Sequence, residues 1–238
     1  MPTERGILFQ DRLVRALLRD LNPKTQTRRL VKPPPREGWH PTVERYNPTV
    51  INRHGDEEPG PEVFGAADEE QGRVCPYGAP GDRLWVREAW HPVSTGGVHY
   101  RADWSGGFTC GCFGVGVGGL PRWRPSIHLR RADARLLLEV TQVRVERLQD
   151  ISEADARAEG VEPSGNGWLG PARPVKQPVG FARKQPGVVL GPMTEQRLYA
   201  TAHEAFMHLW DSINGDRPGA SWAENPWVWA ITFQRVKP

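Results

Sequence analysis

One alternating segment, residues 134–148, restricts the fold of this chain more than any other feature. Its alternating hydrophobic residues are Leu136, Leu138, Val140, Val143 and Val145. A period of two is typical of a β-strand with one buried face. A strand of this length can bend through a closed or nearly closed sheet. We therefore expect a β-rich fold organised around this strand.

Shorter segments predict further strands and a few helices. Strands are expected at 24–31, 83–90, 98–102 and 227–236, where β-branched and aromatic residues are frequent. Helices are expected over 9–20 and 195–213 from hydrophobic residues at helical spacing. This order of elements predicts an α+β fold, with a mostly antiparallel, barrel-like sheet and flanking helices.

A third, short helix is predicted over 151–160 by its capping residues. Ser152 is a typical N-cap, Asp155 stands at the capping-box position, and Gly160 suits the C-terminal stop. Glu159 would lie at the end of this helix.

Two segments rich in proline and glycine lack a lasting hydrophobic period. They span about 32–74 and 161–194, and a third, glycine-rich segment covers 104–120. We interpret them as loops, the first two as long insertions into a single domain spanning 1–238.

Charge and cysteine content narrow the classes of partner and compartment. The net charge is +3, and arginines cluster at 28–29, 122–124 and 130–131, a pattern that favours an anionic partner. No apolar run has membrane-spanning length and no signal peptide is evident, so we expect no membrane association and a cytoplasmic location.

The three cysteines, Cys75, Cys110 and Cys112, are too few for a disulfide framework. They could supply three metal ligands, but their spacing is not that of the common zinc modules. Free thiols, with no metal and no cofactor, are the expectation.

Lys24, Thr27 and Glu159 are the candidate catalytic residues. A lysine of lowered pKa can take the proton of a threonine hydroxyl, which attacks an acyl carbon while a carboxylate moves protons. Strand alternation places Lys24 and Thr27 on opposite faces, so a bulge or twist is needed to join them. The alternative is a purely structural role for all three.

Other polar and aromatic residues are candidates for holding a base or phosphate. Arginine offers planar paired donors, tryptophan stacks on bases, and a carboxylate accepts from a base amine or pairs with an arginine. The candidate substrate-binding residues are Arg29, Trp85, Arg87, Glu88, Ser126 and Arg130.

Several motifs resemble those of a known family. Lys24-Thr25-Gln26-Thr27-Arg28-Arg29 after a first helix looks like the start of ASCH domains, with Asn22-Pro23 in place of the usual Gly-Arg. Three further stretches also resemble that family. They are the Gly-Asp turn and following strand at Gly81–Glu88, the strand and short helix from Val140 to Gly160, and the last strand from Trp227 to Val236. The chain as a whole is similar to uncharacterised phage and prophage proteins, which share Cys75–Gly78, Trp123–His128 and Trp210–Asn214.

The resemblance implies a PUA-like fold and a nucleoside or single-stranded nucleic acid as partner, in the cytoplasm of a bacterial host. It also implies an amidohydrolase that deacylates a modified cytidine, with Lys24, Thr27 and Glu159 at the catalytic positions. A non-catalytic RNA- or DNA-binding module, a ribonuclease, and a phage protein that contacts host machinery remain open as alternatives.

Overall fold

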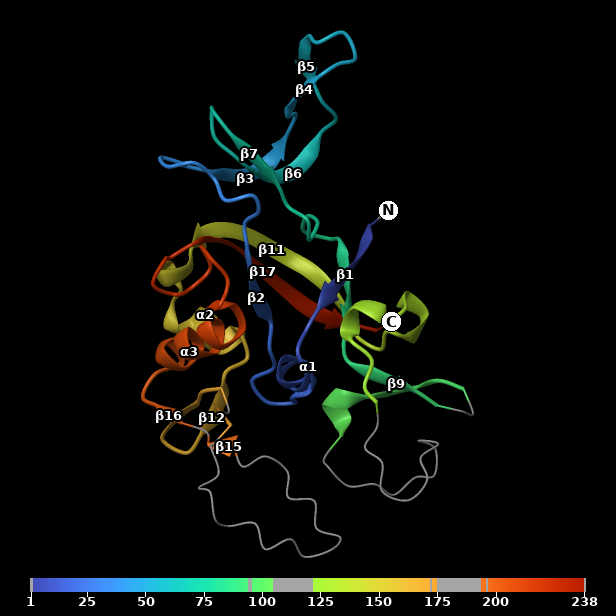
Figure 1. Cartoon of the computed structure of the whole chain (residues 1–238), viewed down its shortest axis with the longest axis vertical. Helices are drawn as coiled ribbons and strands as arrows, with labels where there is room; N and C mark the ends of the chain where they lie inside the picture. The colour runs from blue at the N-terminus through green and yellow to red at the C-terminus, as the bar shows by residue number, and fades with distance from the viewer. Residues whose placement is uncertain are drawn as a thin grey trace, which may run out of the picture.

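A five-stranded sheet forms the centre of the molecule. The structure is a computed structural model and describes residues 2–93, 96–104, 122–171, 173–174, 194–195 and 197–237. The sheet has the order β1-β8-β11-β17-β2. Its strands are β1 (Glu4–Leu8), β8 (Arg83–Arg87), β11 (Leu137–Arg147), β17 (Trp227–Val236) and β2 (Gln26–Leu30). Figure 1 shows β11 and β17 crossing behind β1 and β2.

The pairing of β11 with β17 forms the middle of the core. The two strands run antiparallel, with Val143 opposite Ile231 and an irregularity between Val140 and Gln142. Leu138 and Ile231 are fully buried. The predicted long strand and closing strand are therefore confirmed.

The sheet remains open among the described residues, in contrast to the nearly closed barrel that we expected. β1 pairs only with β8, in parallel, and β2 pairs only with β17. The fold is thus mixed, with many strands and few helices.

In the described part of the chain, three α-helices pack around this sheet. They are α1 (Asp11–Leu18), α2 (Glu153–Ala158) and α3 (Ala202–Asn214). Ser152 caps α2 by accepting from Asp155 N–H, as predicted, and Thr201 caps α3 in the same way. The helix expected from residue 195 begins only at Ala202, because Leu198–Tyr199 forms strand β16.

The first expected insertion is not a loop. It contains a three-stranded sheet of β3 (Thr42–Tyr46), β6 (Val63–Ala67) and β7 (Gly72–Val74), and a hairpin of β4 (Thr49–Ile51) and β5 (Glu57–Pro59). We call residues 42–74 the arm, and Figure 1 shows it projecting from the central sheet, above β11 in this view. Its strands are short, and β3, β4 and β5 are mostly exposed, so they lack the alternation by which a half-buried strand is recognised.

The remaining strands form two two-stranded sheets and one three-stranded sheet. They are β9 (Trp90–Pro92) with β10 (Val98–Tyr100), β12 (Glu162–Ser164) with β13 (Gly167–Leu169) and β16, and β14 (Arg173–Pro174) with β15 (Thr194–Glu195). The second expected insertion is thus partly strand, while its residues 175–193 and the glycine-rich segment 105–121 lie outside the described residues. Within the described part of the chain, no helix is long and apolar enough to cross a membrane.

Candidate functional site

The two edges of the open sheet face each other across a seam. Val31 N–H donates to Trp227 O, and Phe233 N–H donates to Thr25 O. In an antiparallel ladder every second residue directs its N–H and C=O to the partner strand, so those of Arg28 and Leu30 point away from β17. On β1, Phe9 N–H donates to Arg87 O. The same alternation turns the backbone of Gly6 and Leu8 away from β8.

A cavity of about 950 Å³ occupies this seam. We call it the seam cavity. It is lined from β1 by Gly6, Ile7 and Leu8, from β2 by Arg28, Arg29 and Leu30, and from the start of α1 by Gln10, Asp11, Arg12 and Arg15. Free strand edges and the first turn of a helix therefore open onto one space, where backbone N–H groups can meet a ligand.

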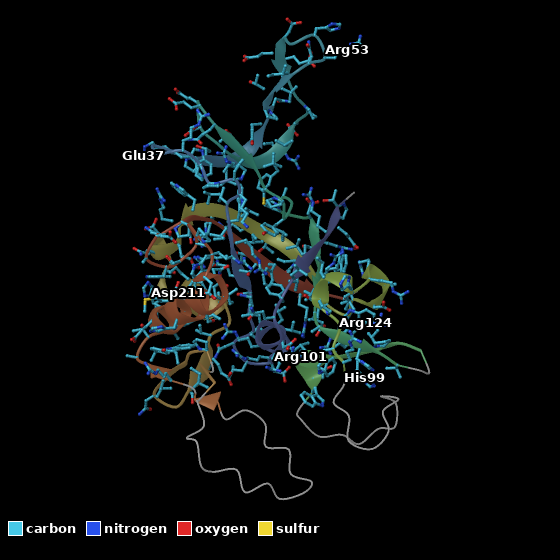
Figure 2. All side chains as sticks on the ribbon, viewed as in Figure 1. Glu37, Arg53, His99, Arg101, Arg124 and Asp211 are labelled. Carbon is cyan, nitrogen blue, oxygen red and sulfur yellow. The ribbon has the colours of Figure 1, made fainter. Side chains whose placement is uncertain are left out.

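The lining of the seam cavity is strongly cationic. Arg28 lines it only through its backbone, and its other charged residues are Arg12, Arg15, Arg29, Lys32, Arg101 and Arg217 against the single carboxylate of Asp11. Asp11 is itself paired with Arg101, at 3.1 Å. Figure 2 shows Arg101 beside α1. The field in this cavity thus favours an anion.

Two of these arginines are desolvated without a carboxylate partner among the described residues. Burial lowers the pKa of Arg12 to about 10, and Arg12 Nε has no hydrogen-bond partner there. Burial also lowers the pKa of Arg29, whose guanidinium lies over the Phe9 ring at 5.0 Å. Both side chains are half-buried and donate to neutral groups, Arg12 to Ser212 Oγ and Arg29 to Leu8 O, so a bound anion would gain favourable charge interactions with both.

The structure brings Lys24 and Glu159 together, behind the wall of the seam cavity. Lys24 Nζ donates to Glu159 Oε2 at 2.7 Å, to Glu159 O at 2.6 Å and to Gln26 O at 2.5 Å. The lysine side chain is fully buried. Burial lowers the pKa of Lys24 to about 8, against the opposing effect of the nearby Glu159 carboxylate.

Arg28 extends this pair into a buried ionic network on the helix side of the sheet. Its guanidinium contacts Glu159 at 3.3 Å, Asp155 at 3.1 Å, and Glu146. The Arg28 side chain is completely buried, so its backbone is the part that lines the seam cavity. Gln26 donates to Asp155 in the same network.

Thr27 points to the other face of β2. It stands opposite Ile231, whereas Gln26 and Arg28 stand opposite Thr232 and Ala230. Among the described residues the buried Thr27 hydroxyl has no recorded hydrogen bond with Lys24 or Glu159, and none of the three lines the seam cavity. The alternation expected for this strand is therefore present.

The candidate substrate-binding residues are distributed over several places. Arg29 and Ser126 line the seam cavity. Trp85 and Arg87 stack on each other, with the guanidinium 4.4 Å from the ring centre. Trp85 belongs to a second small core under β9.

Glu88 and Arg130 have partners within the protein. Glu88 is fully buried and accepts two hydrogen bonds of 2.9 Å from Arg135. Burial raises the pKa of Glu88 against the opposing effect of Arg135. Arg130 is exposed and pairs with Asp133 at 2.7 Å.

The cysteines provide no metal site within the described residues, where no group of three ligand-type side chains exists. Cys75 is buried, and burial raises the pKa of its thiol to about 11. Cys110 and Cys112 lie outside the described residues.

The sequence interpretation missed most of the basic lining. Arg12 and Arg15 stand three residues apart, about one helical turn, and alternate with the hydrophobic pairs Leu13–Val14 and Leu17–Leu18 that defined the helix. That spacing was a usable signal. Arg101 and Arg217 are distant in sequence, and only the fold brings them to the seam.

No protein-family model, curated protein or solved structure matches this chain, so the chemistry of the site is argued from its own residues.

Proposed function

We propose that the seam cavity binds a nucleoside phosphate or a phosphate of single-stranded nucleic acid. The observation that carries the proposal is the cationic lining, in which six basic residues other than Arg28 stand against one carboxylate, Asp11, that is already paired with Arg101. Guanidinium groups suit phosphate because they offer paired planar donors. The first-turn N–H groups of α1 add to this preference.

The same cavity has features suited to a base. Phe9 and Tyr77 line it beside Arg29, and aromatic and guanidinium planes are the usual stacking partners of unpaired bases. The free edges at Gly6, Leu8, Arg28 and Leu30 carry alternating donors and acceptors that can pair with a base edge. A binding role therefore uses both the charge and the open strand edges.

We also infer that the open sheet is a PUA-like pseudobarrel whose seam is the binding cleft. The resemblance of Lys24–Arg29 and Gly81–Glu88 to ASCH domains supports this assignment. So does the curvature by which β1 and β2 come to line one cavity.

Binding is tested by fluorescence anisotropy of a labelled single-stranded oligonucleotide at low salt. Arg217→Gln removes an exposed cation from the cavity rim, and Arg53→Gln makes the same charge change at the tip of the arm (Figure 2). We expect saturable binding that weakens as salt rises, and a loss in Arg217→Gln that Arg53→Gln does not show. Absence of binding by the folded chain, or equal losses in both variants, contradicts the proposal.

A second candidate function is the hydrolysis of an acylated cytidine. One observation favours it: a buried lysine with a pKa of about 8 contacts a carboxylate at 2.7 Å. Lys24 Nζ is 5.7 Å from the centre of the Phe9 ring, which lines the seam cavity. This reaction requires the buried Thr27 side chain to turn toward the cavity from its position opposite Ile231. Its oxygen then bonds to the acyl carbon, the carbon–nitrogen bond breaks, the base amine leaves with the proton of the Thr27 hydroxyl, and water then releases the acid.

The two functions are separated by incubating the chain with acetylcytidine and measuring cytidine by chromatography. An amidohydrolase releases cytidine and acetate, and Thr27→Val and Lys24→Met abolish the release. If the folded wild type binds oligonucleotide but releases no cytidine, the binding function alone stands.

A further inference from the structure

A second cavity lies beside α1, next to the seam cavity. Its volume is about 650 Å³. The two cavities share three lining residues, Gln10, Arg12 and Arg15. These three side chains therefore form a ridge between two hollows, and we call them the α1 ridge.

An arginine stripe runs along the α1 ridge. Arg12, Arg15 and Arg19 are spaced three and four residues apart, so they share one face of the helix. All three line the second cavity. Like charges at this spacing repel each other, and a bound polyanion relieves that repulsion.

The stripe has little internal compensation. Arg19 contacts Glu162 at 3.5 Å and donates to Val161 O. Arg15 donates to Ala102 O, and neither it nor Arg12 has a carboxylate partner among the described residues. Arg12 donates to Ser212 Oγ at 2.9 Å and leaves its Nε unused.

Apolar surface lies beside the stripe in the second cavity. Leu169, which is half-buried, contributes most of it, and the buried Leu13, Val161 and Leu209 contribute their edges. A cation row next to apolar surface suits a strand whose phosphates follow the arginines while a base packs against the hydrophobic side.

We propose that a single strand of nucleic acid runs from the seam cavity over the α1 ridge into the second cavity, so that the ligand is an oligonucleotide and not a free nucleotide. This inference rests on the proposed binding function and adds the length and the path of the ligand. The seam cavity alone is near the upper limit for sites that hold one small molecule, and the two hollows together exceed it.

Ligand length provides the first test and needs no variant. Competition with labelled oligonucleotide compares uridine monophosphate with oligouridylates of increasing length, from the dinucleotide upwards. We expect affinity to rise at least tenfold before it levels off, and the salt dependence to steepen by about 0.7 for each additional phosphate contacted. If the mononucleotide competes as well as the longer strands, the path over α1 is wrong while binding at the seam still stands.

The path itself is tested by Arg15→Gln and Arg19→Gln, with Arg53→Gln as the charge-matched control. Circular dichroism and urea unfolding first show which variants keep the fold. We expect each ridge variant to bind the longer strand several-fold more weakly. Arg19→Gln should leave the affinity for uridine monophosphate unchanged, because Arg19 lines only the second cavity. Equal effects of Arg19→Gln and Arg53→Gln on the longer strand overturn the path. Failure of wild type to bind any of these probes overturns the proposed function as well.

Discussion

Arg29 of β2 donates a hydrogen bond of 2.6 Å from Nη2 to the carbonyl of Leu8 on β1. This contact spans the seam where the two edge strands lack backbone pairing. A side chain thus holds the edges at a distance that leaves room for a cavity. The neighbouring backbone groups of Gly6, Arg28 and Leu30 remain available to a ligand.

Replacing Arg29 by glutamine removes both the bridge and a cavity cation. We expect the free energy of unfolding to fall by roughly 1 kcal/mol, the usual contribution of one hydrogen bond, and oligonucleotide affinity to fall about tenfold, as for one lost charged contact of about 1.4 kcal/mol. Urea unfolding and anisotropy measure the two effects. Arg29→Lys keeps the charge without the planar donors, so its affinity and stability should lie between those of the wild type and those of Arg29→Gln. Wild-type affinity in Arg29→Gln would show that this arginine does not face the ligand.

Lys24→Met tests the buried ion pair. Removing the ammonium leaves Glu159 buried with only the 3.3 Å contact to Arg28, so we expect a loss of about 3 to 5 kcal/mol in urea unfolding. Arg130→Gln is the control, because Arg130 and Asp133 form an exposed pair, for which about 1 kcal/mol or less is usual. Comparable small losses in the two variants would mean that the Lys24 pair contributes no more than a surface pair.

The stability of the chain should depend on pH through Lys24. Its pKa is about 8 in the folded chain, below the ordinary value of 10.5, so between these values the unfolded chain binds more protons than the folded chain. Lys24 therefore makes the free energy of unfolding rise with pH between about 8 and 10.5. Below this window the contribution of Lys24 does not change with pH. The wild-type value minus that of Lys24→Met isolates this contribution. A difference that stays flat or falls between pH 8 and 10.5 contradicts the lowered pKa.

Gly160 fixes the backbone beside Lys24. Its φ is +90°, and a Cβ there would lie 2.8 Å from Ala16 Cβ and 2.9 Å from Lys24 Cβ. Gly160→Ala should therefore cost more than the backbone strain of about 1 to 2 kcal/mol, since the lysine must also shift. Gly219→Ala is the matched control, with φ of +73° and no atom within 4 Å of the added carbon. Equal thermal destabilisation of the two variants would show that contact with Lys24 adds nothing.

The sequence predicted the elements whose patterns are local. The period of two in β11 and β17, the apolar face of α1, and the Ser152 cap of α2 all reflect neighbouring residues in the chain. The contact of Lys24 with Glu159 was expected from the family resemblance and could not follow from spacing, because 135 residues separate them.

Other features depend on contacts that no local pattern records. The strands β3, β4 and β5 of the arm have no buried residue, and β1 lies in a polar segment where only Ile7 is buried. Whether the sheet closes depends on the distance between its two edge strands, β1 and β2, which only the folded structure determines. The basic cavity likewise combines α1 with Arg101 and Arg217.

Residue-resolved amide hydrogen exchange by NMR, with and without saturating oligonucleotide, tests the seam most directly. The account predicts that the edge amides of Gly6, Leu8, Arg28 and Leu30 become protected. The amide of Phe9, already bonded to Arg87 O, and that of Val31, bonded to Trp227 O, should change little. Unchanged exchange at all four edge amides with the ligand bound, or new protection confined to the arm, contradicts the claim that the seam is the binding site.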